Sequence, residues 1–183
     1  MVLMLLTGTF IRSLDDKQRF AIPKPLREGF GQSSDLVLYL APGTDRSLSL
    51  YSEESFTQLA NQLGNHSPNA QETRAFSRLF YAQAQRVDVD RQGRVRLPSD
   101  LAQWAALDKE IILLGVRDHL EVWNPERWES YLSDKQPQYD ALAESAFARS
   151  PSPPLPQRSR SEANDPVVDS SAGTDEFRPP QPR

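Results

Sequence analysis

A nine-residue motif occurs twice in this chain, and it constrains the fold more than any other feature. The first copy occupies residues 15–23 and the second copy residues 90–98. Both copies read Asp-x-x-x-Arg-apolar-x-apolar-Pro, and each fixed position of the second lies 75 residues after its counterpart in the first. A motif duplicated at a constant offset indicates an internal repeat.

Two further blocks follow each copy of the motif in the same order. A dense apolar run occupies residues 36–40 and again residues 111–114. Residues 48–56 are then echoed by residues 120–128, at an offset of 72. The chain therefore contains two copies of one unit of about 55 residues, which is small for an independent core, and we expect the copies to pack on each other.

The pattern of apolar residues and turn signals predicts a mainly β fold with short helices, an α+β class. Continuous apolar runs are typical of strands buried on both faces, and Ser52 and Asn124 are suitable helix N-caps. The expected strands are 9–14, 20–22, 36–40, 47–51, 84–89, 94–97, 110–115 and 119–123. The expected helices are 25–29, 53–64, one that opens at Ser67-Pro68, 99–106 and 125–132.

The repeat and its flanks divide the chain into four predicted parts. These are a first repeat at 5–63, a connecting helix at 64–83, a second repeat with a C-terminal helix at 84–148, and a tail at 149–183. Eight of the 15 prolines lie in the last 35 residues, which contain few large apolar side chains. Such a segment buries too little surface to offset the entropy of ordering, so the tail is predicted to be disordered.

Composition argues against several classes of site. The chain has no Cys, which excludes disulfides, thiolate zinc sites and thiol catalysis and fits a reducing compartment. The two histidines, His66 and His119, belong to no Ser, Asp or Glu constellation that recurs in the repeat, and no glycine-rich phosphate loop is present. We therefore predict no catalytic residue, no metal, no cofactor and no small-molecule substrate. An enzyme remains the third alternative, and a pocket that joins a His to a carboxylate would favour it.

Charge and hydropathy place the expected protein in the cytoplasm. Residues 1–6 are apolar but lack a basic flank, so no signal peptide is expected, and no stretch is long enough to span a bilayer. The formal net charge is −4, so any affinity for nucleic acid must come from the placement of basic residues on one face.

The basic residues of the motif have two interpretations. Lys17 and Arg19 in the first copy, and Arg91, Arg94 and Arg96 in the second, lie in or beside a tight turn, from which they can reach phosphates and base edges of DNA. Alternatively, Arg19 and Arg94 pair with the aspartate that opens each motif and stabilise the turn. Spacing does not decide between the two, although Arg91 and Arg96 have no adjacent acid in that pairing role, which favours a binding role for the second copy.

At this point the chain resembles a known family. The residues that carry the resemblance are Gly8, Leu14, Asp15, Lys17, Arg19, Pro23 and the Asp-x-x-Gly-Arg at 90–94. They resemble the MraZ transcriptional regulators of bacteria, which are tandem members of the AbrB-like, swapped-hairpin superfamily, over about residues 5–145. The resemblance implies a pseudo-dimeric, β-barrel-like core and a ring-shaped homo-oligomer. It also implies a cytoplasmic, nucleoid-associated regulator that binds repeated double-stranded DNA elements in promoters of the division and cell-wall gene cluster, and represses its own operon.

By position, the resemblance implies a DNA-binding role for Lys17, Arg19 and Arg94, and Arg27 falls where AbrB-like proteins often have a basic residue. Together with the residues chosen for their place in or beside the turns, the DNA-binding candidates are Lys17, Arg19, Arg91 and Arg94, with Arg12, Arg27 and Arg96 as secondary candidates. The residues expected to shape the turns are Asp15, Gln18, Asp90 and Gly93. Gln18 departs from the family, where Gly is usual; if that position needs a positive φ, Gln costs on the order of 1 kcal/mol more than Gly.

We therefore predict a sequence-specific DNA-binding transcriptional regulator in which a ring of protomers presents basic turns to successive DNA elements. The rival hypothesis is a structural scaffold, in which the repeat only builds an oligomer. Binding to random duplex that weakens with salt distinguishes the regulator from the scaffold.

Overall fold

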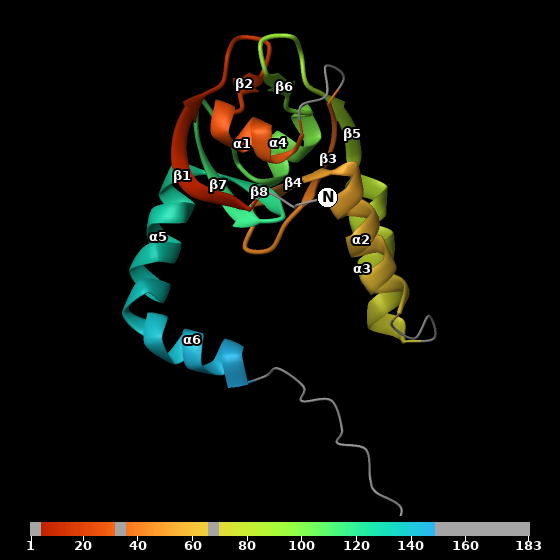
Figure 1. The fold of residues 1–183 in the computed structure, drawn as a ribbon, viewed down its shortest axis with the longest axis vertical. Coiled ribbons are helices and arrows are strands. Elements are labelled where there is room, and N and C mark those ends of the chain that lie inside the picture. The colour runs from red at the N-terminus through yellow and green to blue at the C-terminus, as the bar shows by residue number, and fades with distance from the viewer. Residues whose placement is uncertain (1–4, 32–35, 66–69, 149–183) are drawn as a thin grey trace, which may run out of the picture. The chain divides into compact units, whose positions relative to one another are not determined.

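The computed structural model describes residues 5–31, 36–65 and 70–148, and these residues form two antiparallel sheets and several short helices (Figure 1). The strands are β1 (Leu6–Ser13), β2 (Arg19–Ala21), β3 (Val37–Pro42), β4 (Leu48–Ser52), β5 (Gln85–Asp88), β6 (Arg94–Arg96), β7 (Glu110–Arg117) and β8 (His119–Trp123). The helices are α1 (Lys24–Gly29), α2 (Glu53–Gly64), α3 (Gln71–Gln83), α4 (Ser99–Trp104), α5 (Pro125–Lys135), the 3₁₀ turn η1 (Gln136–Gln138) and α6 (Tyr139–Ala148). One compact unit extends to Leu142, and a second unit begins at Ala143, within α6.

The strand order of the larger sheet reflects the repeat. Its six strands run β1-β7-β8-β4-β3-β5, and the two halves of this order are counterparts in the two copies of the unit. Among the strands of the described residues, only the hairpins β3–β4 and β7–β8 pair strands of the same copy. β1 pairs with β7, β4 with β8 and β3 with β5 across the copies. The copies are therefore interleaved, and neither has a complete sheet without the other.

The smaller sheet places the two motifs face to face. In the β2–β6 pair, Phe20 lies opposite Val95, and these residues are each other's counterparts in the repeat. A residue that faces its own counterpart marks a local twofold axis, so the two motifs meet about a pseudo-twofold at this point. Both side chains are 0% exposed, and burial of each contributes about 1.5–3 kcal/mol.

The α+β class and the tandem repeats expected from the sequence are confirmed, but the sheet does not close into a barrel. The six-stranded sheet ends in two edge strands, β1 and β5, and the β2–β6 pair forms a separate sheet. An isolated bridge between Val89 and Val95 joins the two ladders on one side. The strands β2 and β6 are only three residues long, and they pair with each other.

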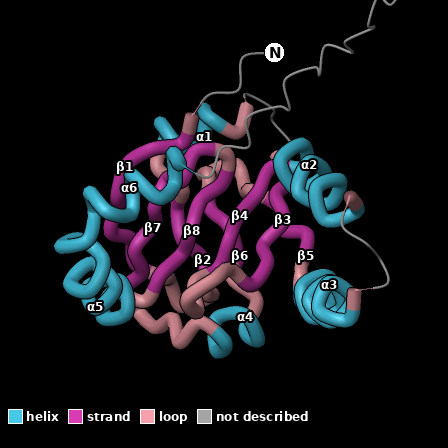
Figure 2. The backbone as a smooth tube through the Cα atoms, turned by 90° about the horizontal axis from the view of Figure 1, so that it is seen from below, coloured by secondary structure: helices cyan, strands magenta, loops and turns pink. Residues whose placement is uncertain are grey.

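The two faces of the large sheet are covered differently. The main core lies on the face that β2, β6, α1 and α4 cover, where Phe20, Leu40, Leu50, Leu101 and Leu113 are all buried. On the other face, α2 and α3 contact β3, and α5 contacts β7 (Figure 2). No helix in the described ranges is long and apolar enough to cross a membrane.

The helices of the outer face begin at the expected caps. Ser52 accepts a hydrogen bond from the backbone N–H of Ser55 at 3.1 Å, and Asn124 accepts one from Arg127 at 3.1 Å. The aromatic ring of Phe56 then stacks on Tyr39 of β3, with the ring centroids 4.6 Å apart.

Three expectations about helix boundaries and the tail have different outcomes. The expected opening of α3 at residues 67–68 and the predicted disorder of residues 149–183 both lie outside the described residues. The helix expected to end near residue 132 instead continues to Lys135 and is followed by α6.

Close packing between the copies predicts a strong effect at Gly115. A Cβ added there would lie 2.6 Å from the carbonyl carbon of Leu6 and 2.7 Å from the Cα of Thr7, both backbone atoms of β1. Gly115→Ala should therefore push β1 away from β7 and lower the free energy of unfolding by about 1–3 kcal/mol. Urea denaturation measures the change.

Gly64 provides the matched control for this substitution. A Cβ added at Gly64 has open space, and the residue is the last of α2. Gly64→Ala should leave stability unchanged or raise it by up to ~1 kcal/mol. Equal stability of the two variants would contradict the described approach of β1 to β7.

Candidate nucleic-acid interface

The first turn is built around the carboxylate of Asp15. Its Oδ1 accepts hydrogen bonds from the backbone N–H groups of Lys17 and Arg19, both at 2.9 Å. The backbone N–H of Gln18 donates to the carbonyl of Asp15 at 2.8 Å. An aspartate that bonds the backbone of its own turn in this way fixes the reversal between β1 and β2.

The second turn repeats this arrangement between β5 and β6. Oδ1 of Asp90 accepts from the backbone N–H groups of Gln92 and Arg94, again both at 2.9 Å. The N–H of Gly93 donates to the carbonyl of Asp90 at 2.8 Å. The two turns thus have the same backbone hydrogen bonds.

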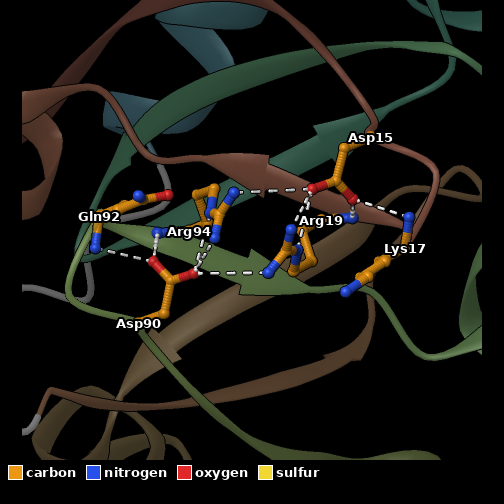
Figure 3. A network of polar contacts seen from close by, with 6 residues as sticks. All are labelled: Asp15, Lys17, Arg19, Asp90, Gln92 and Arg94. Carbon is orange, nitrogen blue, oxygen red and sulfur yellow. Dashed lines mark hydrogen bonds and ion pairs between the residues drawn. The ribbon is translucent and has the colours of Figure 1, made fainter.

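The two turns are joined by a quartet of charged side chains at the pseudo-twofold (Figure 3). Arg19 donates from Nε to Oδ2 of Asp15 at 2.9 Å, and its Nη2 lies 2.8 Å from the same oxygen. Arg94 makes the same contacts with Asp90, at 2.9 and 2.8 Å. Each arginine also reaches the aspartate of the other turn, at 3.9 Å for Arg19 and 3.8 Å for Arg94.

This quartet keeps both carboxylates ionised. The hydrogen bond from the Arg19 side chain lowers the pKa of Asp15 to about 2, from an ordinary value of 3.8. The backbone N–H of Arg94, followed by its side chain, lowers the pKa of Asp90. Each of the guanidinium groups of Arg19 and Arg94 thus pairs with the aspartate of its own motif, as the turn-stabilising interpretation expects, and also reaches the aspartate of the other motif.

The residue at the fourth position of each motif has a left-handed backbone, which was an open question for Gln18. Gln18 has φ 56° and Gly93 has φ 75°. The side chain of Gln18 lies towards the other copy, where its Oε1 accepts a hydrogen bond from Oγ of Ser99 at 3.1 Å. At the second turn the space beside Gly93 is filled by the Arg27 guanidinium, which a Cβ on Gly93 would meet.

The remaining candidates separate into two groups. Lys17, Arg91 and Arg96 are exposed, and within the described residues no hydrogen bond or ion pair engages their side chains. Lys17 and Arg96, from different copies, line an open notch of about 510 Å³ together with Asp16, Gln18 and Arg19.

Arg12 belongs to the second group. It lies on β1 over the ring of Phe10, with its Cζ 5.9 Å from the ring centroid, and donates to the carbonyl of Ile11 at 2.7 Å. Among the described residues, these contacts do not include either turn.

His119 lies beside two carboxylates, but both come from its own hairpin. Its Nδ1 is 3.0 Å from Oδ1 of Asp118, and its Nε2 is 3.7 Å from Oε1 of Glu121. Burial lowers the pKa of His119, but hydrogen bonds with Glu121 and Asp118 outweigh burial and raise it. Glu121 also accepts from Nε1 of Trp123 at 2.8 Å, so this cluster is accounted for by pairing within β8 and its turn.

Within the described segments, no group of three or more His, Asp or Glu side chains is placed to hold a metal ion.

Comparison with known proteins identifies the family. The family model described as "MraZ protein, putative antitoxin-like" matches the chain twice, over residues 5–79 and 80–150. The chain belongs to the MraZ family. Proteins named transcriptional regulator MraZ are similar over most of their length. The one from Moorella thermoacetica is 35% identical over 75% of this chain and 93% of its own. The one from Thermomicrobium roseum is 42% identical over 66% and 82%.

The repeat in this MraZ chain also carries information about contacts between the two motifs, which the residue spacing within one motif does not show. Sequence reasoning paired each arginine with the aspartate of its own motif, and it missed the contacts between the motifs and the bond from Ser99 to Gln18. The available signal was symmetry: two motifs at a constant offset, in a chain whose copies must pack together, tend to meet at equivalent residues.

The contact between Arg27 and Gly93 leads to a prediction about turn geometry. Gly93→Ala should lower the free energy of unfolding by about 1–2 kcal/mol, because Ala is strained at positive φ and must displace Arg27. In an Arg27→Ala background the same substitution should cost only the backbone strain, about 1 kcal/mol. A double-mutant cycle by urea denaturation measures the difference, and an additive cycle would exclude the contact.

The lowered pKa of Asp15 predicts a pH dependence. The folded pKa lies below the ordinary value, so its pairing stabilises the folded state fully above about pH 4, and this contribution is lost as the pH falls towards 2. Asp15→Asn keeps an oxygen for the turn but loses the charge, so the variant should lose less stability over this range than the wild type. The side chain is 34% exposed, which makes the difference modest. Parallel profiles in urea denaturation would show that Asp15 contributes nothing through its charge.

Proposed function

We propose that this chain is a sequence-specific DNA-binding transcriptional regulator, as the names of its MraZ relatives suggest. One observation carries the proposal: the two turns enter the antiparallel β2–β6 ladder from its two ends, are linked by the quartet, and lie next to each other at the top of Figure 1, with exposed cations that have no described partner. A protein of net charge −4 binds DNA only where its cations gather on one face. Paired turns joined by a quartet provide such a face.

The arginines of the quartet and the exposed cations of the turns have different roles in this interface. Arg19 and Arg94 hold the two turns in a fixed relation, because each is bound to its own aspartate and reaches the other. Lys17 and Arg91 then contact DNA from the exposed part of each turn. Because the quartet contains two arginines and two aspartates, it adds no net charge, and the attraction for phosphate comes from the residues around it. Arg27 and Arg96 add charge beside the turns.

The proposal extends to assembly and biological role. A ring-like homo-oligomer that presents several interfaces to repeated promoter elements gains affinity because later contacts form at a high effective concentration. Such an assembly acts in the cytoplasm at the nucleoid, and represses its own operon in the division and cell-wall gene cluster. It needs no cofactor or small-molecule substrate, and it has no enzymatic role.

Charge removal in the turns tests the proposal. Lys17→Ala and Arg91→Ala should melt like the wild type, because neither side chain has a described structural partner. Each should weaken binding to duplex DNA and reduce the slope of log affinity against log salt by roughly one unit for each phosphate that is no longer neutralised. Fluorescence anisotropy over a range of salt concentrations measures both effects.

Lys135→Ala is the matched control. Lys135 is a cation on α5 that pairs with Asp134 at 2.8 Å, and its loss should leave DNA binding unchanged. Light scattering should return a mass well above the 20.7 kDa of one chain for every variant, so that changes in assembly are not mistaken for direct effects on DNA binding. If DNA binding by the wild type does not respond to salt, the regulator hypothesis is contradicted and the scaffold hypothesis is favoured.

A further inference from the structure

The repeat allows the tip of each turn to be compared with its counterpart, position by position. The backbone hydrogen bonds of the two turns are the same, so the differences at the tips lie in the side chains. The counterparts are Asp16 and Arg91, Lys17 and Gln92, and Gln18 and Gly93. The second turn therefore presents an arginine and a glutamine where the first presents an aspartate and a lysine.

The tip of the second turn has the chemistry of base recognition. Arg91 and Gln92 are exposed, and within the described chain no hydrogen bond or ion pair holds either side chain. Arginine pairs bidentately with guanine and glutamine with adenine in the major groove. Gly93 adds no side chain next to them, and no acid stands at this tip to repel the acceptor groups of the bases.

The tip of the first turn is less suited to reading bases. The side-chain oxygen of Gln18 already accepts a hydrogen bond from Ser99, which competes with a bidentate contact to a base, and Asp16 carries a negative charge beside Lys17. Lys17 is a flexible point charge, which suits a phosphate.

The wall of the first turn adds a second cation. Arg96 lines the notch with Lys17, whereas its counterpart beside the second turn is Ala21. Two cations that face one notch, neither engaged by a carboxylate among the described residues, are placed to contact the DNA backbone.

We propose that the two turns have different tasks: the second reads base edges through Arg91 and Gln92, and the first contacts only the sugar–phosphate backbone through Lys17 and Arg96. This inference rests on the proposed DNA-binding function and names the residues that determine its specificity. It also gives each protomer a direction on the DNA, because a two-turn interface with unequal turns cannot bind an asymmetric element equally well in both orientations.

Counterpart variants test the division. The full-length wild type and the variants Arg91→Ala, Gln92→Ala, Lys17→Ala and Arg96→Ala are each used to select from a randomised duplex library at one salt concentration. All four side chains are exposed, and a melting curve confirms that each variant is folded. Arg91→Ala and Gln92→Ala should each lose preference at one base pair of the selected element, by roughly 5- to 150-fold.

The first-turn variants should behave differently. Lys17→Ala and Arg96→Ala should select the same element as the wild type, bind every duplex more weakly, and reduce the salt slope by about one unit each. A gain-of-function variant completes the set: Asp16→Arg with Lys17→Gln gives the first turn the tip of the second, and should add a base preference that the wild type lacks.

The outcomes separate this inference from the function on which it rests. Suppose that the wild type selects a defined element, that Lys17→Ala changes the selected element, and that Gln92→Ala does not. The assignment of tasks to the two turns is then wrong, while the proposed regulator function is not contradicted. The assignment is equally wrong if none of the four variants changes the selected element. If the wild type binds all duplexes equally, sequence-specific recognition fails and this inference fails with it.

Discussion

The structure depends on the pairing of two motifs about a pseudo-twofold. Phe20 faces its counterpart Val95 in the β2–β6 ladder, with both side chains fully buried, and the charged quartet lies where the adjoining turns meet. The large sheet follows the same symmetry, since its strand order places counterparts at equal distances from the centre. A unit that is too small for its own core is completed by its copy, so folding and construction of the interface are one event.

The quartet explains how the turns remain close without repelling each other. Four charged groups in so small a space are tolerated because they alternate in sign, and because each aspartate also accepts two backbone N–H groups. The side chains are about a quarter to a third exposed, so solvent still screens them, and their main effect is geometric. They fix the spacing of the two turn tips, and under the proposed function this spacing determines which groups on a duplex both tips can reach together.

Sequence reasoning recovered the local features of this fold and missed the features that depend on the meeting of the copies. The strands and the caps at Ser52 and Asn124 follow from neighbouring residues, and they were predicted correctly. The resemblance to the family raised the question of a positive φ at Gln18, and the structure has it. The open sheet could not be predicted, because a repeat pattern does not say whether edge strands close on each other. The contacts of Arg19 with Asp90 and of Ser99 with Gln18 join residues about 70–80 positions apart, and spacing within a motif carries no information about them.

The two copies also differ in a complementary way where turn and helix meet. At the first turn Gln18 has a long side chain, and the helix position equivalent to Arg27 is the small residue Ala102. At the second turn Gly93 has no side chain, and the Arg27 guanidinium fills the space beside it. In both cases one of the two positions, on the turn or on the helix, has a large residue and the other has a small one. The combined size of the two residues is therefore similar although the residues themselves differ. The tips have no such constraint, because Lys17, Arg91 and Gln92 are exposed and no hydrogen bond or ion pair within the described chain engages their side chains. Duplication therefore preserves the framework of the interface and leaves the two tips free to acquire different tasks.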